Sequence, residues 1–139
     1  MRRINSSAGF TMLEVLVAIL ILVVALTEMV GLTATVVRAN TSSKASTTAT
    51  TLAGEKLEEL KNTDYASLTD GTNTDYATSS GTVQTSASGA YYTRTWTIAT
   101  DNLGTSTDTT DDMKNISVSV TWSWMGNSRQ VTLSSKVAQ

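Results

Sequence analysis

Residues 10–26 form an almost uninterrupted apolar run, and a single carboxylate, Glu14, interrupts it. A helix over this run would be about 25 Å long at about 1.5 Å per residue. This length is at the short limit for crossing a bilayer whose hydrocarbon core is about 30 Å thick. A carboxylate inside a bilayer costs about 2.5–3.5 kcal/mol, so a plain anchor is not expected to carry one. Glu14 is therefore a candidate functional residue, and its partner must be sought.

The residues before this run form a short polar leader, 1–9, with two basic residues, Arg2 and Arg3. The leader has no apolar segment of its own, so it does not have the pattern of an ordinary secretory signal. The two arginines flank the N-terminal end of the apolar run, and Glu28 follows the other end. The positive-inside rule therefore predicts a cytoplasmic leader and a C-terminal region outside the cytoplasm.

The junction Gly9-Phe10-Thr11-Met12-Leu13-Glu14 resembles the processing site of type IV prepilins and type II secretion pseudopilins. This resemblance implies that a prepilin peptidase cuts between Gly9 and Phe10 and methylates the new amino group of Phe10. It also implies that Glu14 acts in subunit assembly, paired with the Phe10 amino group of a neighbouring subunit or with its own before docking. The alternative interpretation is a simple signal anchor, with Glu14 a tolerated charge near the cytoplasmic interface.

The helix is expected to continue well beyond the membrane. Apolar residues recur at helical spacing as far as Leu60, and the segment 55–61 is rich in strong helix formers. No proline interrupts this stretch, so we predict one helix over 10–62, transmembrane over about 10–30. Gly31 and the Ser/Thr-rich stretch 41–51 are its weakest points, because glycine and short hydroxyl residues lower helix propensity. A break into two helices is the alternative.

The remaining sequence predicts a small antiparallel sheet. Residues 63–90 are rich in Thr, Ser, Asp and Gly and are expected to form the long αβ-loop of the pilin family, with room for short strands. Three strands are predicted in 91–139, and in the clearest of them, 116–124, apolar residues alternate strictly with Ser or Thr. One apolar face implies a sheet covered on one side, and the long helix is the expected cover. The predicted fold class is α+β, with the indoles of Trp96, Trp122 and Trp124 facing the helix.

Composition excludes several kinds of chemistry. The chain has no cysteine and no histidine, so thiolate chemistry and the commonest general base are absent. Its formal net charge of −2 argues against nucleic acid as the main partner. The acidic segment 101–112 could bind Ca²⁺, but its spacing does not match an EF-hand, and a solvated loop is the preferred interpretation. We therefore expect no enzyme activity and no cofactor.

The C-terminal strands also resemble those of PilV-type minor pilins and GspI-type pseudopilins, through Tyr92-x-x-x-Trp96, Ile116-x-Val118-x-Val120-x-Trp122 and Val131-x-Leu133. This implies a minor pilin-like filament subunit in a tip or priming complex. Its expected partners are prepilin peptidase, other pilins or pseudopilins, the pilus assembly platform and the bacterial inner membrane. From the membrane it would pass into a pilus or pseudopilus. A type II secretion pseudopilin is the close alternative. A monomeric membrane-anchored binding protein, with 63–89 as its active surface, is the alternative of another class.

Overall fold

The computed structural model describes residues 9–101 and 113–138. The chain divides into two compact units, Met1–Thr41 and Ser42–Gln139, and each is described by itself. One α-helix, α1 (Met12–Lys61), belongs to both units. The first unit contains its N-terminal part, and in the second unit its C-terminal part packs on a sheet. α1 is continuous, as predicted, and the alternative of a break into two helices is not seen in the described residues.

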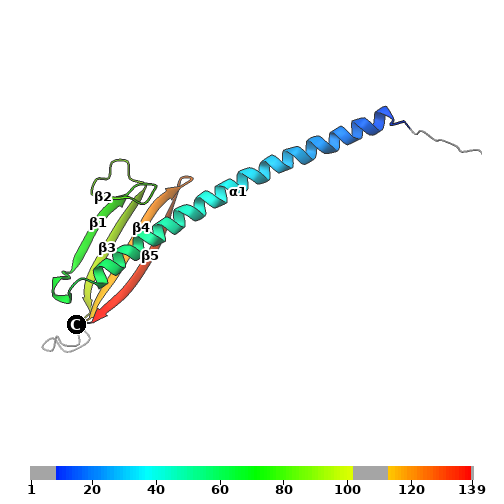
Figure 1. Ribbon diagram of the computed structural model, residues 1–139. Coiled ribbons are helices and arrows are strands. Elements are labelled where there is room, and N and C mark those ends of the chain that lie inside the picture. The colour runs from blue at the N-terminus through cyan, green and yellow to red at the C-terminus, as the bar shows by residue number, and fades with distance from the viewer. Residues whose placement is uncertain (1–8, 102–112, 139) are drawn as a thin grey trace, which may run out of the picture. The chain divides into compact units, whose positions relative to one another are not determined.

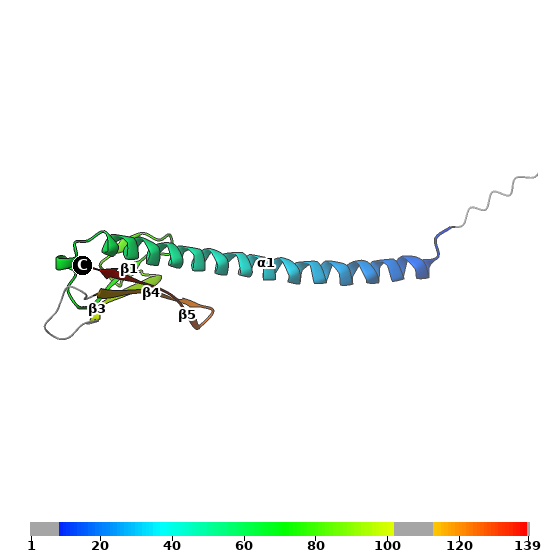
Figure 2. The same ribbon diagram turned by 90° about the horizontal axis from the view of Figure 1, so that it is seen from below.

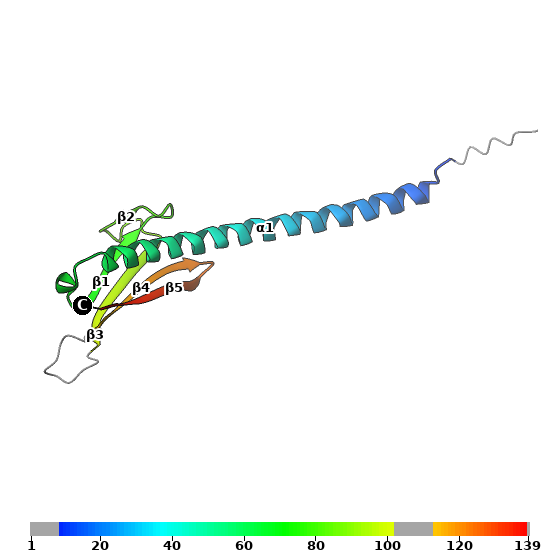
Figure 3. The same cartoon turned by 60° about the horizontal axis from the view of Figure 1, so that its bottom comes forward.

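The second unit combines the end of α1 with a five-stranded antiparallel sheet of order β2-β1-β3-β4-β5. Figure 2 shows the helix lying on one side of this sheet, and Figures 1 and 3 show β5 at the edge opposite to β2. The predicted α+β class is therefore confirmed. A short 3₁₀ helix precedes the strands, which are β1 (Gly71–Ala77), β2 (Val83–Gln84), β3 (Tyr92–Asp101), β4 (Met113–Trp124) and β5 (Asn127–Ala138).

The core lies between α1 and the central strands. On the helix side, the apolar stripe that ends at Leu60 is buried, as the sequence pattern predicts. On the sheet side, Ile116, Val118 and Val120 of β4 have no exposed surface. Tyr92 of β3 reaches the helix, where its hydroxyl donates a hydrogen bond to the carbonyl of Ala45 at 3.1 Å. This burial raises the pKa of Tyr92 above its ordinary value, while a hydrogen bond with Thr48 acts in the opposite direction.

All three tryptophans lie on the helix-facing side of the sheet, but to different depths. Trp122 is buried, with 7% of its surface exposed, whereas Trp96 and Trp124 are half-buried at the margin of the core. The ammonium group of Lys56, on α1, lies 4.2 Å from the centre of the Trp96 ring. Cation–π contact and the cover of a lysine stem therefore replace full burial at Trp96.

The opposite face of the sheet is covered by hydroxyl groups. Side chains that are neighbours across the strands bond to one another, as in the pairs Thr72–Thr97 at 3.0 Å and Thr74–Thr95 at 3.2 Å. Such pairs contribute to strand pairing without burying apolar surface. The alternation of apolar and Ser/Thr residues thus corresponds to one dry face and one solvated face.

Strand β1 lies within the segment 63–90 that was expected to be a loop with short strands. It is seven residues long, and its register with β3 runs without interruption from Gly71 opposite Ile98 to Ala77 opposite Tyr92. Hydrophobic periodicity does not identify this strand, because its helix-facing positions include the polar residues Asn73 and Asp75. Polar cross-strand contacts take the place of apolar ones.

The main polar contact of β1 is an ion pair inside the second unit. Arg94 of β3 binds Asp75 through two parallel hydrogen bonds of 2.9 and 2.6 Å, and it donates a third, of 3.0 Å, to the carbonyl of Leu52 on α1. The side chains of Arg94 and Asp75 are 6% and 16% exposed. The guanidinium group of Arg94 therefore joins β1, β3 and α1. Each of its three nitrogen atoms donates a hydrogen bond, so none of them is buried without a partner.

Two further contacts hold the ends of the sheet. Lys114 of β4 donates to the carbonyls of Tyr65 and Leu68, so it fixes the 3₁₀ helix Tyr65–Ser67 and the buried Leu68 against the sheet. At the same end, Lys136 and Asn115 donate to Asp101 and hold the pKa of that carboxyl below its ordinary value. The ends of β3, β4 and β5 are thus tied together outside the apolar core.

We predict that Trp122→Ala destabilises the second unit strongly. Truncation of a buried aromatic side chain typically costs about 3–5 kcal/mol, which is a large part of the stability of a small domain. The matched control is Trp124→Ala, two residues along the same strand, which removes a half-buried indole and should cost clearly less. Thermal denaturation of the full chain in detergent measures both, and equal melting temperatures for Trp122→Ala and the parent would contradict the burial argument.

We predict that Arg94→Met is severely destabilising and that a second change rescues it. The single variant leaves the carboxylate of Asp75 unpaired in a mostly buried site, at a cost of about 3–5 kcal/mol. In the double variant Arg94→Met with Asp75→Leu no unpaired charge remains, so most of the lost stability should return. Denaturant unfolding of the two single variants and the double variant completes the cycle. Additive losses would show that the pair is not coupled.

Candidate processing and assembly site

The expected cleavage junction lies in the non-helical residues directly before α1. Gly9 and Phe10 are exposed, and Phe10 has 83% of its surface free. A Cβ atom placed on Gly9 would have no other atom within 4 Å, so the chain itself has room for a side chain there. A requirement for glycine at this position would therefore come from the enzyme that reads the junction and not from the fold.

Thr11 is the N-cap of α1. Its hydroxyl accepts a hydrogen bond from the backbone N–H of Glu14 at 3.3 Å, and its carbonyl accepts from the N–H of Val15 at 3.2 Å. Thr11-Met12-Leu13-Glu14 also has the spacing of a capping box, with the acidic residue in the first turn, where the helix dipole favours a negative charge. The junction is thus non-helical up to Thr11, and α1 begins immediately after it.

Glu14 lies in a shallow groove on one face of the helix. Phe10, Ala18 and Leu22 line the groove with it, together with Val15 and Ile19. Glu14, Ala18 and Leu22 follow one another at four-residue intervals, so the carboxylate stands directly before a position with a small side chain. Among the residues that the structure describes, the Glu14 carboxylate has no ion pair or hydrogen-bond partner. A second helix can approach closely at Ala18, and the free carboxylate would lie beside it.

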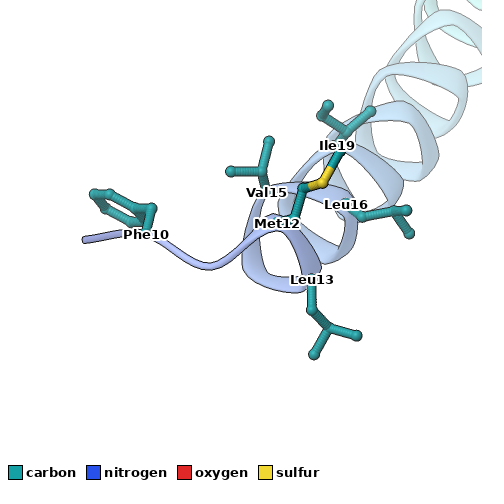
Figure 4. A pocket seen from close by; sticks show the side chains of 6 residues that line it. All are labelled: Phe10, Met12, Leu13, Val15, Leu16 and Ile19. Carbon is teal, nitrogen blue, oxygen red and sulfur yellow. The ribbon is translucent and has the colours of Figure 1, made fainter. Parts of the chain in front are cut away.

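The surface around this groove is apolar on all sides of the helix. Figure 4 shows side chains that point outward around the first turns of α1, those of Phe10, Met12, Leu13, Val15, Leu16 and Ile19. Large apolar residues stay exposed beyond Glu28 as well, as far as Val37. α1 is the helix of the described chain that is long and apolar enough to cross a membrane, and its most apolar segment has no cover in the first unit. A helix that is apolar all round needs lipid or other helices around it.

Polar groups within this apolar surface are satisfied locally. The Thr27 hydroxyl donates to the carbonyls of Val23 and Val24, both at 2.8 Å, and Thr33 donates to the carbonyl of Met29 at 3.0 Å. A hydroxyl group bonded to its own helix can enter hydrocarbon without an unpaired donor. Among the described residues, the carboxylates of Glu14 and Glu28 have no such local partner, and Glu14 is the one that lies inside the apolar run 10–26.

Comparison with known proteins identifies this segment. A family model, described as the prokaryotic N-terminal methylation motif, matches residues 4–27. The chain carries a prokaryotic N-terminal methylation motif. This motif is that of the type IV pilin and pseudopilin family, whose members are structural subunits, and it implies processing by a prepilin peptidase. No curated protein matches the chain, and no solved structure matches it.

The motif and the fold agree with each other. A long N-terminal helix packed on an antiparallel sheet is a pilin-like arrangement, so the chain is type IV pilin-like in both its N-terminal segment and its α+β architecture. The matched residues cover the expected cleavage junction, Glu14 and the whole apolar run 10–26. They do not extend into the sheet, so the match does not assign a subfamily.

The other candidate sites differ in their outcome. Most of the acidic segment 101–112 lies outside the described residues, and the described Asp101 binds Lys136 and Asn115. In the described part of the chain, no group of three or more acidic side chains could hold a metal ion. Sequence reasoning did not identify Thr11 as the cap, although the Thr-x-x-Glu spacing was visible. It also missed the Arg94–Asp75 pair, for which the sequence offers no local signal.

Proposed function

We propose that the chain is a minor subunit of a type IV pilus-like filament. In this proposal prepilin peptidase cuts between Gly9 and Phe10 and methylates Phe10, the helix crosses the bacterial inner membrane over about residues 10–30, and the C-terminal unit lies outside the cytoplasm. The observation that carries the proposal is the position of the methylation motif, 4–27, on a helix start whose apolar surface has no cover in its own unit.

The role of Glu14 follows from its environment. Cleavage at Gly9 would create a positive charge on Phe10, four residues before a carboxylate that has no partner among the described residues. In a low-dielectric medium an unpaired carboxylate is costly, and pairing recovers much of that cost. Glu14 and the Phe10 amino group of a neighbour can meet only when the two helices are staggered. The pair would therefore set the axial offset between neighbouring helices during assembly.

A minor subunit in a tip or priming complex is favoured over a major one by the strands of the sheet. Tyr92, Trp96 and the alternating residues of β4 and β5 resemble those of PilV-type minor pilins. The same pattern occurs in GspI-type pseudopilins, so a type II secretion pseudopilin is the second candidate. Both would share the cleavage and the pairing of Glu14, whereas a monomeric anchored protein would not need the pair.

We predict that Gly9→Val blocks processing without disturbing the chain. The structure has space for a side chain at Gly9, so the variant should fold and insert as the parent does. Intact mass of the membrane-extracted protein reads the outcome. The parent should begin at methylated Phe10, and Gly9→Val should retain its leader. A parent that keeps Arg2, or is cut within the apolar run, would refute the proposed junction.

We predict that Glu14→Gln leaves expression, cleavage and insertion intact and sharply reduces incorporation into filaments or tip complexes. Glutamine keeps the shape of the side chain and removes its charge, so a loss reports on charge pairing. Glu28→Gln is the matched control, because it removes the next carboxylate of the same helix just outside the motif. Cross-linking in the cell measures incorporation. Normal incorporation of Glu14→Gln would show that apolar packing suffices and that the proposed role of Glu14 is wrong, whereas a parent that never enters a filament or tip complex would favour the anchored monomer.

A further inference from the structure

The two edges of the sheet differ in how far they can pair with another strand. At one edge, β2 is two residues long, so it offers little backbone. At the other edge, β5 is 12 residues long and pairs with β4 along its whole length, and no described strand pairs with its outer side. A long free edge is a template for an added strand unless the chain protects it.

The turn before β5 decides which backbone groups face outward. Met125 and Gly126 both have positive φ, of 51° and 79°, which defines a type I′ turn closed by Trp124 and Asn127. In such a two-residue hairpin the closing residues exchange both backbone hydrogen bonds, and the pattern then alternates along the ladder. The odd-numbered residues of β5 therefore bond to β4. The even-numbered ones direct N–H and C=O to the free edge, and they include Ser128, Gln130, Thr132, Ser134 and Lys136.

This edge lacks two of the usual protections, a bulge and a proline. The register of β4 and β5 runs residue for residue from Trp124–Asn127 to Met113–Ala138, so no bulge bends the strand away, and the chain contains no proline. On the helix-facing side, Val131, Leu133 and Val137 are only half-buried beside the core. An added strand with apolar side chains at alternate positions would complete the cover of these three residues.

Charge restricts the partner further. β5 contains Arg129 and Lys136 and no acidic residue. Lys136 is paired with Asp101 at 3.0 Å, whereas Arg129, on the same side as Val131 and Leu133, has no ion pair within the described residues. A second copy of β5 would bring further positive charge and no carboxylate. A foreign strand with a carboxylate opposite Arg129 would be attracted.

We propose that the outer edge of β5 is a strand-addition site for an extended segment of a second protein, with apolar side chains at alternate positions and a carboxylate placed to meet Arg129. The backbone of the even-numbered residues would supply the hydrogen bonds. The row of Val131, Leu133 and Val137 would favour a strand whose apolar side chains face the same side of the sheet. This interaction is independent of the proposed cleavage at Gly9 and of Glu14.

The test uses the full chain in detergent and a fluorescent peptide as long as β5, 12 residues, of sequence Thr-Glu-(Thr-Val)₄-Thr-Glu. We expect the peptide to bind, and Thr132→Pro to weaken binding at least about tenfold, because proline removes an outward N–H and obstructs the incoming strand. The matched control Thr132→Ala lacks the same hydroxyl but keeps the N–H, so it should bind as the parent does. Proline at an outward position leaves the bonds to β4 in place, so thermal melting should change little.

A second pair of variants and two control peptides complete the experiment. Ser134→Pro, compared with Ser134→Ala, serves as a second edge variant should Thr132→Pro not fold. Peptides with lysine in place of glutamate, or with the valines made contiguous, should bind clearly more weakly. Failure of the alternating peptide to bind, or equal binding by the proline and alanine variants, would overturn the proposal. Self-association of the parent that the proline variants abolish would show a second copy as the occupant and would overturn it as well.

Discussion

The sheet has one apolar face, and the C-terminal part of α1 is the element that covers it. This constraint organises the second unit. The buried row of β4, the hydroxyl of Tyr92 on the carbonyl of Ala45, and the guanidinium of Arg94 on the carbonyl of Leu52 all end on the helix. A single helix cannot cover five strands evenly. The core is therefore completely buried at the centre, and side chains such as Trp124 and Leu133 are half-buried at its margin.

The same helix has the opposite property in the first unit. Between Met12 and Val37 its large apolar side chains are exposed on all sides, and its hydroxyl groups are satisfied by its own carbonyls. Such a surface is stable in lipid or among other helices, but not in water. One continuous element thus serves two environments, because its residues change from apolar all round to amphipathic near Ser42. The proposed subunit, held in a membrane and then transferred to a filament, needs this combination.

Polar contacts in this molecule act mostly where apolar contacts cannot. β1 carries too few apolar residues to be held by burial, and the bidentate pair of Arg94 with Asp75 holds it in place. Lys114 secures the 3₁₀ helix through two carbonyls, and Asp101 gathers Lys136 and Asn115 at the end of the sheet. These non-covalent contacts join elements that are distant in a chain that has no cysteine and so no disulfide.

The sequence by itself determined the features that depend on local pattern. The apolar run with Glu14, the long helix without proline, and the alternation from Ile116 to Trp124 are visible residue by residue, because helix and strand periods are local properties. Tertiary structure alone decided the rest. β1 has no such period. It is held by the pair of Asp75 with Arg94, 19 residues away in the chain, which no local pattern reveals. The depth of each tryptophan, and the free edge of β5 with its half-buried valines and leucine, depend on where one helix lies on five strands, and no local pattern encodes that position.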